Sequence, residues 1–138
     1  MSELVRFGVS IENPLLEQFD RLIYERNYTT RSEAIRDLIR NELVHEEWKN
    51  LDTESVGTIT IIYDHHLREL NNILTSVQHD YNHQIISTMH VHLDHDNCLE
   101  VLAVKGKTRI IKQIADKIIS IKGVKHGKLV TTTSGKQV

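Results

Sequence analysis

The sequence predicts an α+β protein in two parts, a short strand–helix–helix unit followed by a larger unit of alternating strands and helices. Three observations predict this class. The chain begins with alternating apolar and polar residues, two stretches of helical periodicity follow, and strand and helix patterns then take the order β-α-β-β-α-β. With 138 residues, 39% of them hydrophobic, the chain is long enough for one ordinary domain or two small ones.

The first strand is predicted over residues 5–11, where Val5, Phe7, Val9 and Ile11 alternate with smaller or polar residues. Asn13 is expected to cap a helix that has Pro14 in its first turn and runs to about Arg26. A capping-box pattern over residues 30–33 begins a second helix that reaches about Trp48.

A unit of about 45 residues with a single strand is too small to be stable alone, because that strand has no ladder partner. We therefore expect a homodimer in which two N-terminal strands pair antiparallel and their apolar faces cover the helices. The polar faces would carry Arg6, Gly8 and Ser10 on a two-stranded ribbon. A ribbon of this width fits the DNA major groove.

Residues 50–55 are polar and predict a linker between a DNA-binding domain over 1–49 and a second domain over 56–134, with a tail over 135–138. The element order of the second domain is that of ferredoxin-like and ACT-like domains. Its predicted strands span 56–63, 85–93, 98–105 and 128–133, and its predicted helices span 65–79 and 110–119.

Composition narrows the function classes. The net charge is −2, and −3 over the first fifty residues, so no general basic field indicates nucleic acid. No apolar run is long enough to span a membrane and the start does not look like a secretory signal, which predicts a cytoplasmic protein without a membrane partner. The single cysteine excludes an internal disulfide, and eight of nine histidines follow residue 50, which points to metal or proton chemistry there.

The hairpin over 85–105 predicts a metal site. If paired residue numbers sum to 190, His92 opposes Cys98 and His90 opposes Glu100 on one face of the hairpin. This register is favoured because a slip by one residue would mix apolar and polar groups on both faces. Two imidazoles and a thiolate could then converge on one ion, a donor set that suits Zn, Cu, Co and Ni. On the other face, expected to meet the helices, this register pairs Met89 with Val101 and Val91 with Leu99.

The sequence resembles the family of nickel-responsive transcriptional regulators over nearly its whole length. The resemblance rests on RSEAIRDLIR (31–40) in a ribbon-helix-helix unit, on His79, on the segments 90–93 and 98–100, and on GVKHG (123–127). It implies a nickel-dependent repressor, not an enzyme, that binds a palindromic operator in double-stranded DNA and controls nickel uptake. It also implies a homotetramer assembled through the C-terminal domains.

The resemblance also implies site residues. One Ni²⁺ per chain would be bound by His90, His92 and Cys98 of one subunit and His79 of another, with Gln78 and Glu100 beside these ligands. We expect the other three ligands on the sheet face away from the helices and His79 on the helix side, so a partner chain would supply His79 most directly.

For DNA, the resemblance implies that Arg6, Gly8 and Ser10 face bases, and we expect Arg31 to approach phosphates. Gly8 and Ser10 depart from the Arg-x-Thr-x-Thr pattern of related proteins. Glu33 and Asp37 match a second cation site, although acidic residues four apart are also typical of a solvated helix face.

Two other functions remain open from the residues alone. A metal-dependent hydrolase could use the same ligands with Glu100 as base, and an ACT-type amino-acid sensor could carry an incidental metal. Four further histidines could bind metal weakly or simply be solvated: His65, His66, His83 and His95.

Overall fold

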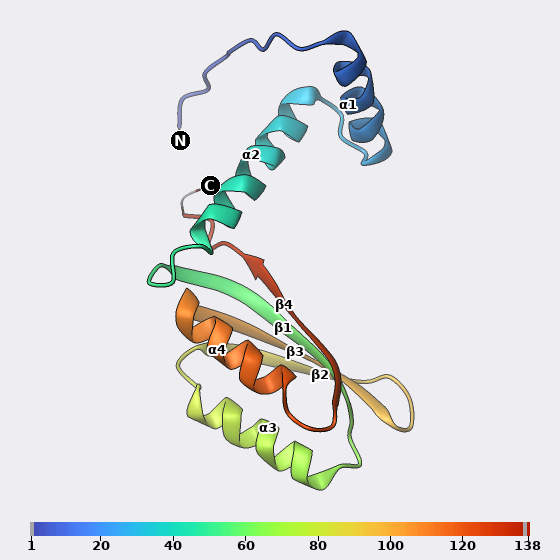
Figure 1. The fold of residues 1–138 in the computed structure, drawn as a ribbon, viewed down its shortest axis with the longest axis vertical. Helices are drawn as coiled ribbons and strands as arrows, with labels where there is room; N and C mark the ends of the chain where they lie inside the picture. The colour runs from blue at the N-terminus through green and yellow to red at the C-terminus, as the bar shows by residue number, and fades with distance from the viewer. Residues whose placement is uncertain (1, 137) are drawn as a thin grey trace. The chain divides into compact units, whose positions relative to one another are not determined.

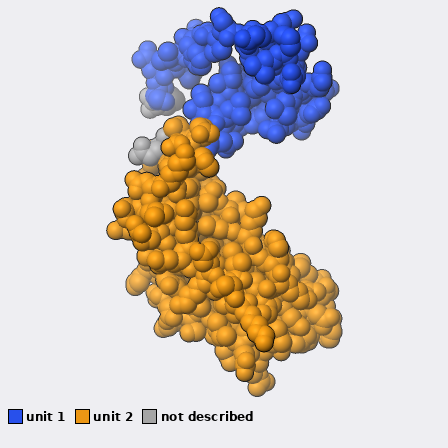
Figure 2. Space-filling view, in the orientation of Figure 1, with its two compact units in different colours: residues 1–41 blue, residues 42–138 orange. Residues whose placement is uncertain are grey.

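The computed structural model describes residues 2–136 and 138, which form two compact units (Figure 2): Met1–Asn41 and Glu42–Val138. The division falls inside a continuous helix, α2 (Arg31–Glu47), so the end of this helix belongs to the second unit.

In the first unit, α1 (Asn13–Glu25) begins one residue earlier than predicted. Glu12 is the N-cap and Asn13 is already helical, so the cap assigned to Asn13 was wrong; no side chain caps this end, and Pro14 lies in the first turn. The helix ends before Asn27, whose φ of 63° is the left-handed conformation that stops a helix.

The capping box at the start of α2 is only half formed. The Thr30 hydroxyl accepts a hydrogen bond from the Glu33 amide at 3.2 Å, as predicted. The Glu33 carboxylate, however, accepts a hydrogen bond from the Thr29 hydroxyl at 2.9 Å. One helix-end donor is therefore satisfied by a side chain, and the carboxylate holds the preceding loop.

The strand predicted over residues 5–11 is not formed in the single chain, where residues 2–12 have no regular structure. A strand needs hydrogen bonds to a neighbour, and one copy of this segment provides none. Its apolar side chains are correspondingly exposed, with 81% of Val5 and 70% of Phe7 accessible to solvent.

The second unit has the predicted element order, with an antiparallel sheet of order β2-β3-β1-β4 and helices α3 and α4 on one face of it (Figure 1). The predicted element ends are off by no more than four residues. The elements are β1 (Glu54–Asp64), α3 (Arg68–Asp80), β2 (Ile85–His92), β3 (Asn97–Lys107), α4 (Thr108–Ile119) and β4 (Val124–Thr132).

The β2–β3 register is confirmed, with His92 opposite Cys98 and His90 opposite Glu100. The prediction of which face of this hairpin the helices cover was wrong. Cys98 and Glu100 are buried on the side of the core, whereas Met89 and Val91 are exposed. The reason is that residues 101–104 are apolar at every position, so alternation in β3 cannot tell which face the helices cover.

The core of this unit joins the sheet to both helices. It contains residues from β1 and β3, from α3 and from α4, together with Trp48 at the end of α2. No helix within residues 2–136 is both long enough and apolar enough to cross a membrane.

Candidate metal centre

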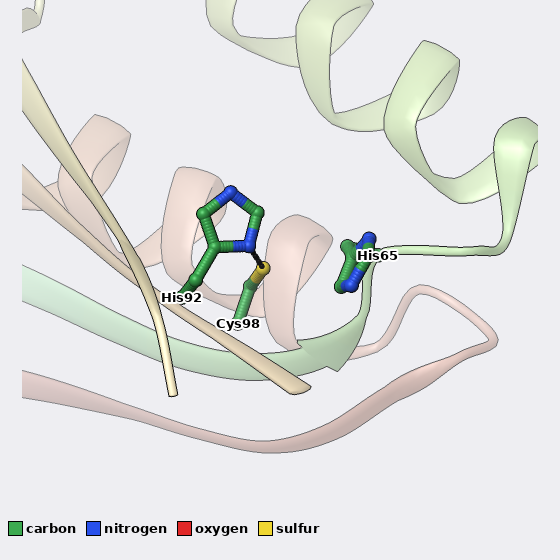
Figure 3. A group of neighbouring side chains, drawn as sticks. All are labelled: His65, His92 and Cys98. Carbon is green, nitrogen blue, oxygen red and sulfur yellow. Dashed lines mark hydrogen bonds between the residues drawn. The ribbon is translucent and has the colours of Figure 1, made fainter. Parts of the chain in front are cut away.

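The hairpin between β2 and β3 brings an imidazole against the thiol. The Cys98 Sγ lies 3.3 Å from the His92 Nδ1, and the thiol is fully buried while the His92 side chain is exposed (Figure 3). His65, in the turn after β1, completes a group whose potential ligand atoms all lie within 4.8 Å of one another. Three donors from three segments thus meet at one end of the strands.

The donor set fits nickel. Two imidazole nitrogens and one sulfur are borderline ligands, which divalent nickel, copper, cobalt and zinc accept and magnesium and calcium do not. Burial raises the pKa of the Cys98 thiol, and the carboxylates of Glu100, Asp94 and Asp64 raise it further. A bound divalent cation opposes both effects, because it stabilises the thiolate.

His90 belongs to a neighbouring network. Its Nδ1 lies 3.2 Å from the Tyr63 hydroxyl, and its ring centroid lies 5.2 Å from that of His92. Tyr63 also donates a hydrogen bond to Glu100 at 3.1 Å. Burial and the Glu100 charge raise the pKa of Tyr63, so this hydroxyl keeps its proton at neutral pH.

Glu100 is buried, with 6% of its surface exposed, and it also accepts a hydrogen bond from the Gln78 amide at 2.7 Å. Gln78 lies in the last turns of α3, so this contact ties α3 to the strand that carries Cys98. Tyr63 is a residue of this network that no sequence motif indicated. It follows Ile61 by two residues and Ile59 by four, and this spacing places all three on the core face of β1.

The other candidate histidines lie outside the group of His65, His92 and Cys98. His79 is exposed in the last turn of α3 and is outside the His65, His92 and Cys98 group. His66 forms a second, exposed group with His95 and Asp96, and the rings of His65 and His66 lie with their centroids 4.0 Å apart. His83 is exposed and belongs to neither group.

The DNA-binding candidates lie in the first unit. Arg6, Gly8 and Ser10 are all exposed, and nothing lies within 4 Å of where a Cβ at Gly8 would be. Arg31 is held in a two-pronged ion pair with Asp20, whose Oδ2 lies 2.8 Å from the Arg31 Nη2.

The two acidic residues assigned to a second cation site are bound to protein groups. The Asp37 carboxylate accepts a hydrogen bond from the Tyr28 hydroxyl at 2.6 Å, and Glu33 accepts one from Thr29 at 2.9 Å. Neither carboxylate is part of a metal-ligand group in the described residues.

Two family models match the chain. Residues 56–132 match the NikR C-terminal nickel-binding domain, and residues 5–46 match the ribbon-helix-helix protein, copG family. These matches cover the metal-centre hairpin and the N-terminal unit respectively.

Similar curated proteins carry the name "Putative nickel-responsive regulator". Those of Solibacter usitatus and Geobacter sulfurreducens are 56% and 58% identical over 138 residues, which is 100% of this chain and 99% of each relative. A solved structure of an uncharacterized protein from Thermotoga maritima is 16% identical with a TM-score of 0.53, covering 59% of this chain and 100% of that one. That likeness concerns the fold alone.

Proposed function

Because the chain belongs to the family of nickel-responsive regulators, which are transcriptional regulators and not enzymes, we propose that it is a nickel-dependent repressor. The observation that carries the proposal is the His92–Cys98 pair, a nitrogen and a sulfur ligand side by side within the matched nickel-binding domain. When bound, nickel would be coordinated by the thiolate and the imidazoles together and so link these side chains through one ion.

For this centre we propose one nickel ion per chain, held by His90, His92 and Cys98 of one chain and His79 of another. Opposite sheet faces do not favour donation of His79 from another chain, because Cys98 lies on the helix side of the sheet. What supports it is that His79 is exposed and outside the local group of donors, where a neighbouring chain could use it. Glu100 and Gln78 would hold the hairpin and α3 around the ligands.

For the DNA we propose a homodimer through the strand over residues 5–11 and a palindromic operator. The exposed apolar residues of this strand support the pairing, and a two-fold dimer matches two inverted half-sites. Arg6, Gly8 and Ser10 would face bases, and Arg31 phosphates.

The C-terminal domains, which we delimit as 56–134, would join two dimers into a homotetramer. The open face of their sheet supports an interface, because Met89 and Val130 are each about half exposed on it. The other proposed bounds are the DNA-binding domain at 1–49, the linker at 50–55 and the tail at 135–138.

A repressor that is active only when nickel is bound would act when nickel is plentiful, so we propose nickel uptake as the controlled process and the cytoplasm as its place of action. We leave Glu33 and Asp37 as a proposed second cation site, which would have to compete with Tyr28 and Thr29 for the carboxylates.

The proposal is tested by binding the full chain to a pool of promoter fragments, with nickel and with nickel removed by a chelator. We expect DNA binding with nickel only, and a sulfur-to-metal absorption band that Cys98→Ala abolishes together with binding. His83→Ala, which removes an exposed histidine outside both groups, should behave as the wild type. Equal DNA binding with and without nickel would contradict the proposed function.

A further inference from the structure

The segment that joins α2 to β1 is not a free tether. Trp48, the chain's only tryptophan, follows α2 directly and is 6% exposed as part of the core. Its Nε1 donates a hydrogen bond to the Thr132 carbonyl at the end of β4, at 2.8 Å. The indole reaches the sheet at Gly57, where an added Cβ would lie 3.4 Å from its ring and 2.8 Å from the Val130 carbonyl.

The start of α4 holds the rest of the segment. The Lys112 ammonium donates to the Trp48 carbonyl at 3.4 Å, and the amide of Arg109 donates to the Leu51 carbonyl at 3.0 Å. The Thr108 amide and hydroxyl both donate to the Thr53 carbonyl, at 2.9 and 3.0 Å. The Thr108 and Arg109 amides are among those that the first turn of a helix cannot satisfy internally.

A buried hydroxyl pair closes this junction. The Ser55 and Thr108 hydroxyls lie 2.6 Å apart, and both residues are no more than 1% exposed. The residues expected to form a polar linker are therefore fixed to the metal-binding unit at several points, from the indole of Trp48 to the beginning of β1.

The same two strands carry this junction and the metal centre. In the β1–β3 ladder, Tyr63 pairs with Cys98 near one end, and Gly57 pairs with Val104 near the other. A change in the sheet at the thiol thus has a continuous hydrogen-bonded route to the Trp48 indole. From there the backbone enters α2, which is helical without a break from Arg31.

We infer that Trp48 is a positioning residue that couples metal binding to DNA binding, by fixing the end of α2 to the sheet that carries Cys98. The inference rests on the proposed function. With the indole in place, ordering of the sheet restricts the end of α2. Without it, the helix end can pivot while the metal ligands stay unchanged, so the two binding events become independent.

The quantity to measure is the ratio of DNA affinities with and without nickel, determined by fluorescence anisotropy with a labelled promoter fragment selected on the wild type. We expect Trp48→Ala to lower this ratio about tenfold or more, within the usual range of coupling between sites. Nickel affinity without DNA should stay within about twofold of the wild type. By linkage, the factor by which DNA raises nickel affinity should fall equally.

Two milder variants keep the test valid if Trp48→Ala does not fold. Trp48→Phe keeps an aromatic ring but removes the donor to Thr132, and Thr108→Val removes a hydroxyl with little change of shape. Both should lower the ratio less than Trp48→Ala. Leu51→Ala is the matched control, because it lies in the same segment, its side chain is exposed, and its hydrogen bond to α4 comes from the backbone carbonyl.

The outcomes separate the two proposals. If wild-type DNA binding does not depend on nickel, the proposed function is wrong and the inference falls with it. If the wild type responds to nickel and all three folded variants keep its affinity ratio, the function stands and the coupling role of Trp48 is overturned. Loss of nickel affinity in Trp48→Phe, with the ratio unchanged, would also overturn it, because the indole would then support the centre itself.

Discussion

The Tyr63 hydroxyl bridges two residues of the metal hairpin: it donates to the buried Glu100 carboxylate at 3.1 Å and lies 3.2 Å from the His90 Nδ1. Since the phenol keeps its proton at neutral pH, it can donate only one hydrogen bond at a time. The donation to Glu100 leaves the phenol oxygen as an acceptor for the His90 tautomer that carries its hydrogen on Nδ1. The opposite ring nitrogen, Nε2, would then be free to bind a metal.

We expect Tyr63→Phe to weaken nickel binding about 10-fold or more, the usual effect of losing a group that orients a metal ligand. It should also lower the free energy of unfolding by about 1–3 kcal/mol, because the buried Glu100 loses one of its donors. The measurements are a nickel titration against a competing chelator and urea unfolding. Tyr24→Phe, on an exposed tyrosine, is the control and should change neither. Unchanged nickel affinity in Tyr63→Phe would show that the hydroxyl does not orient His90.

A second prediction concerns the turn that brings His92 to Cys98. The Asp94 carboxylate accepts hydrogen bonds from the amides of Asp96 and Asn97 at 2.9 and 2.8 Å and from the Asn97 side chain at 3.2 Å. We expect Asp94→Ala to loosen this turn and weaken nickel binding severalfold. Asp116→Ala, on the exposed side of α4, should have no effect on nickel binding.

The pH dependence of this turn follows from the same hydrogen bonds. The Asn97 side chain, followed by the backbone amides, lowers the pKa of Asp94 below its ordinary value. A carboxylate with a lowered folded pKa stabilises the fold above its unfolded pKa of about 4, and this contribution is lost as the pH falls through the folded pKa. The difference in stability between wild type and Asp94→Ala should therefore be constant from pH 8 to 6 and shrink only in acid. A difference that already disappears at pH 6 would contradict this role.

The sequence predicts the hairpin register well because a one-residue slip would have placed histidine opposite leucine. It does not predict the covered face, because Val101 to Val104 are apolar on both sides and only the packing of α3 and α4 decides between them. His65 was missed as a neighbour of Cys98 for a different reason. Its position depends on the turn after β1, and no periodicity in the sequence defines the path of that turn.

A third prediction concerns Arg31, whose guanidinium is held by Asp20 and is therefore less available to a phosphate. The hydrogen bond from Arg31 lowers the pKa of Asp20, so the pair persists at neutral pH. We expect Asp20→Asn to raise DNA affinity severalfold and to steepen its salt dependence, because the released Arg31 guanidinium can contact a phosphate of the DNA backbone.

Glu17→Gln makes the same change of charge on α1 and controls for the general effect of removing a negative charge. The two variants should differ by more than the error of a salt titration. Equal increases in DNA affinity would indicate that only net charge matters and that the ion pair does not restrain Arg31.

The last prediction decides whether His79 acts within its own chain or across chains. His79 is exposed and apart from the donors that gather at Cys98, among which His65 is the nearby histidine of the same chain. Mixing His79→Ala with a His90→Ala/His92→Ala double variant places one intact triad and one intact His79 in the same oligomer. Donation across chains then restores one complete centre with the wild-type nickel spectrum, whereas donation within a chain restores none.

Subunit exchange, checked by mass spectrometry of differently tagged chains, makes a negative result meaningful. A His79→Ala protein that keeps the wild-type nickel spectrum by itself, with the spectrum lost in His65→Ala, would instead assign the fourth ligand to the turn after β1.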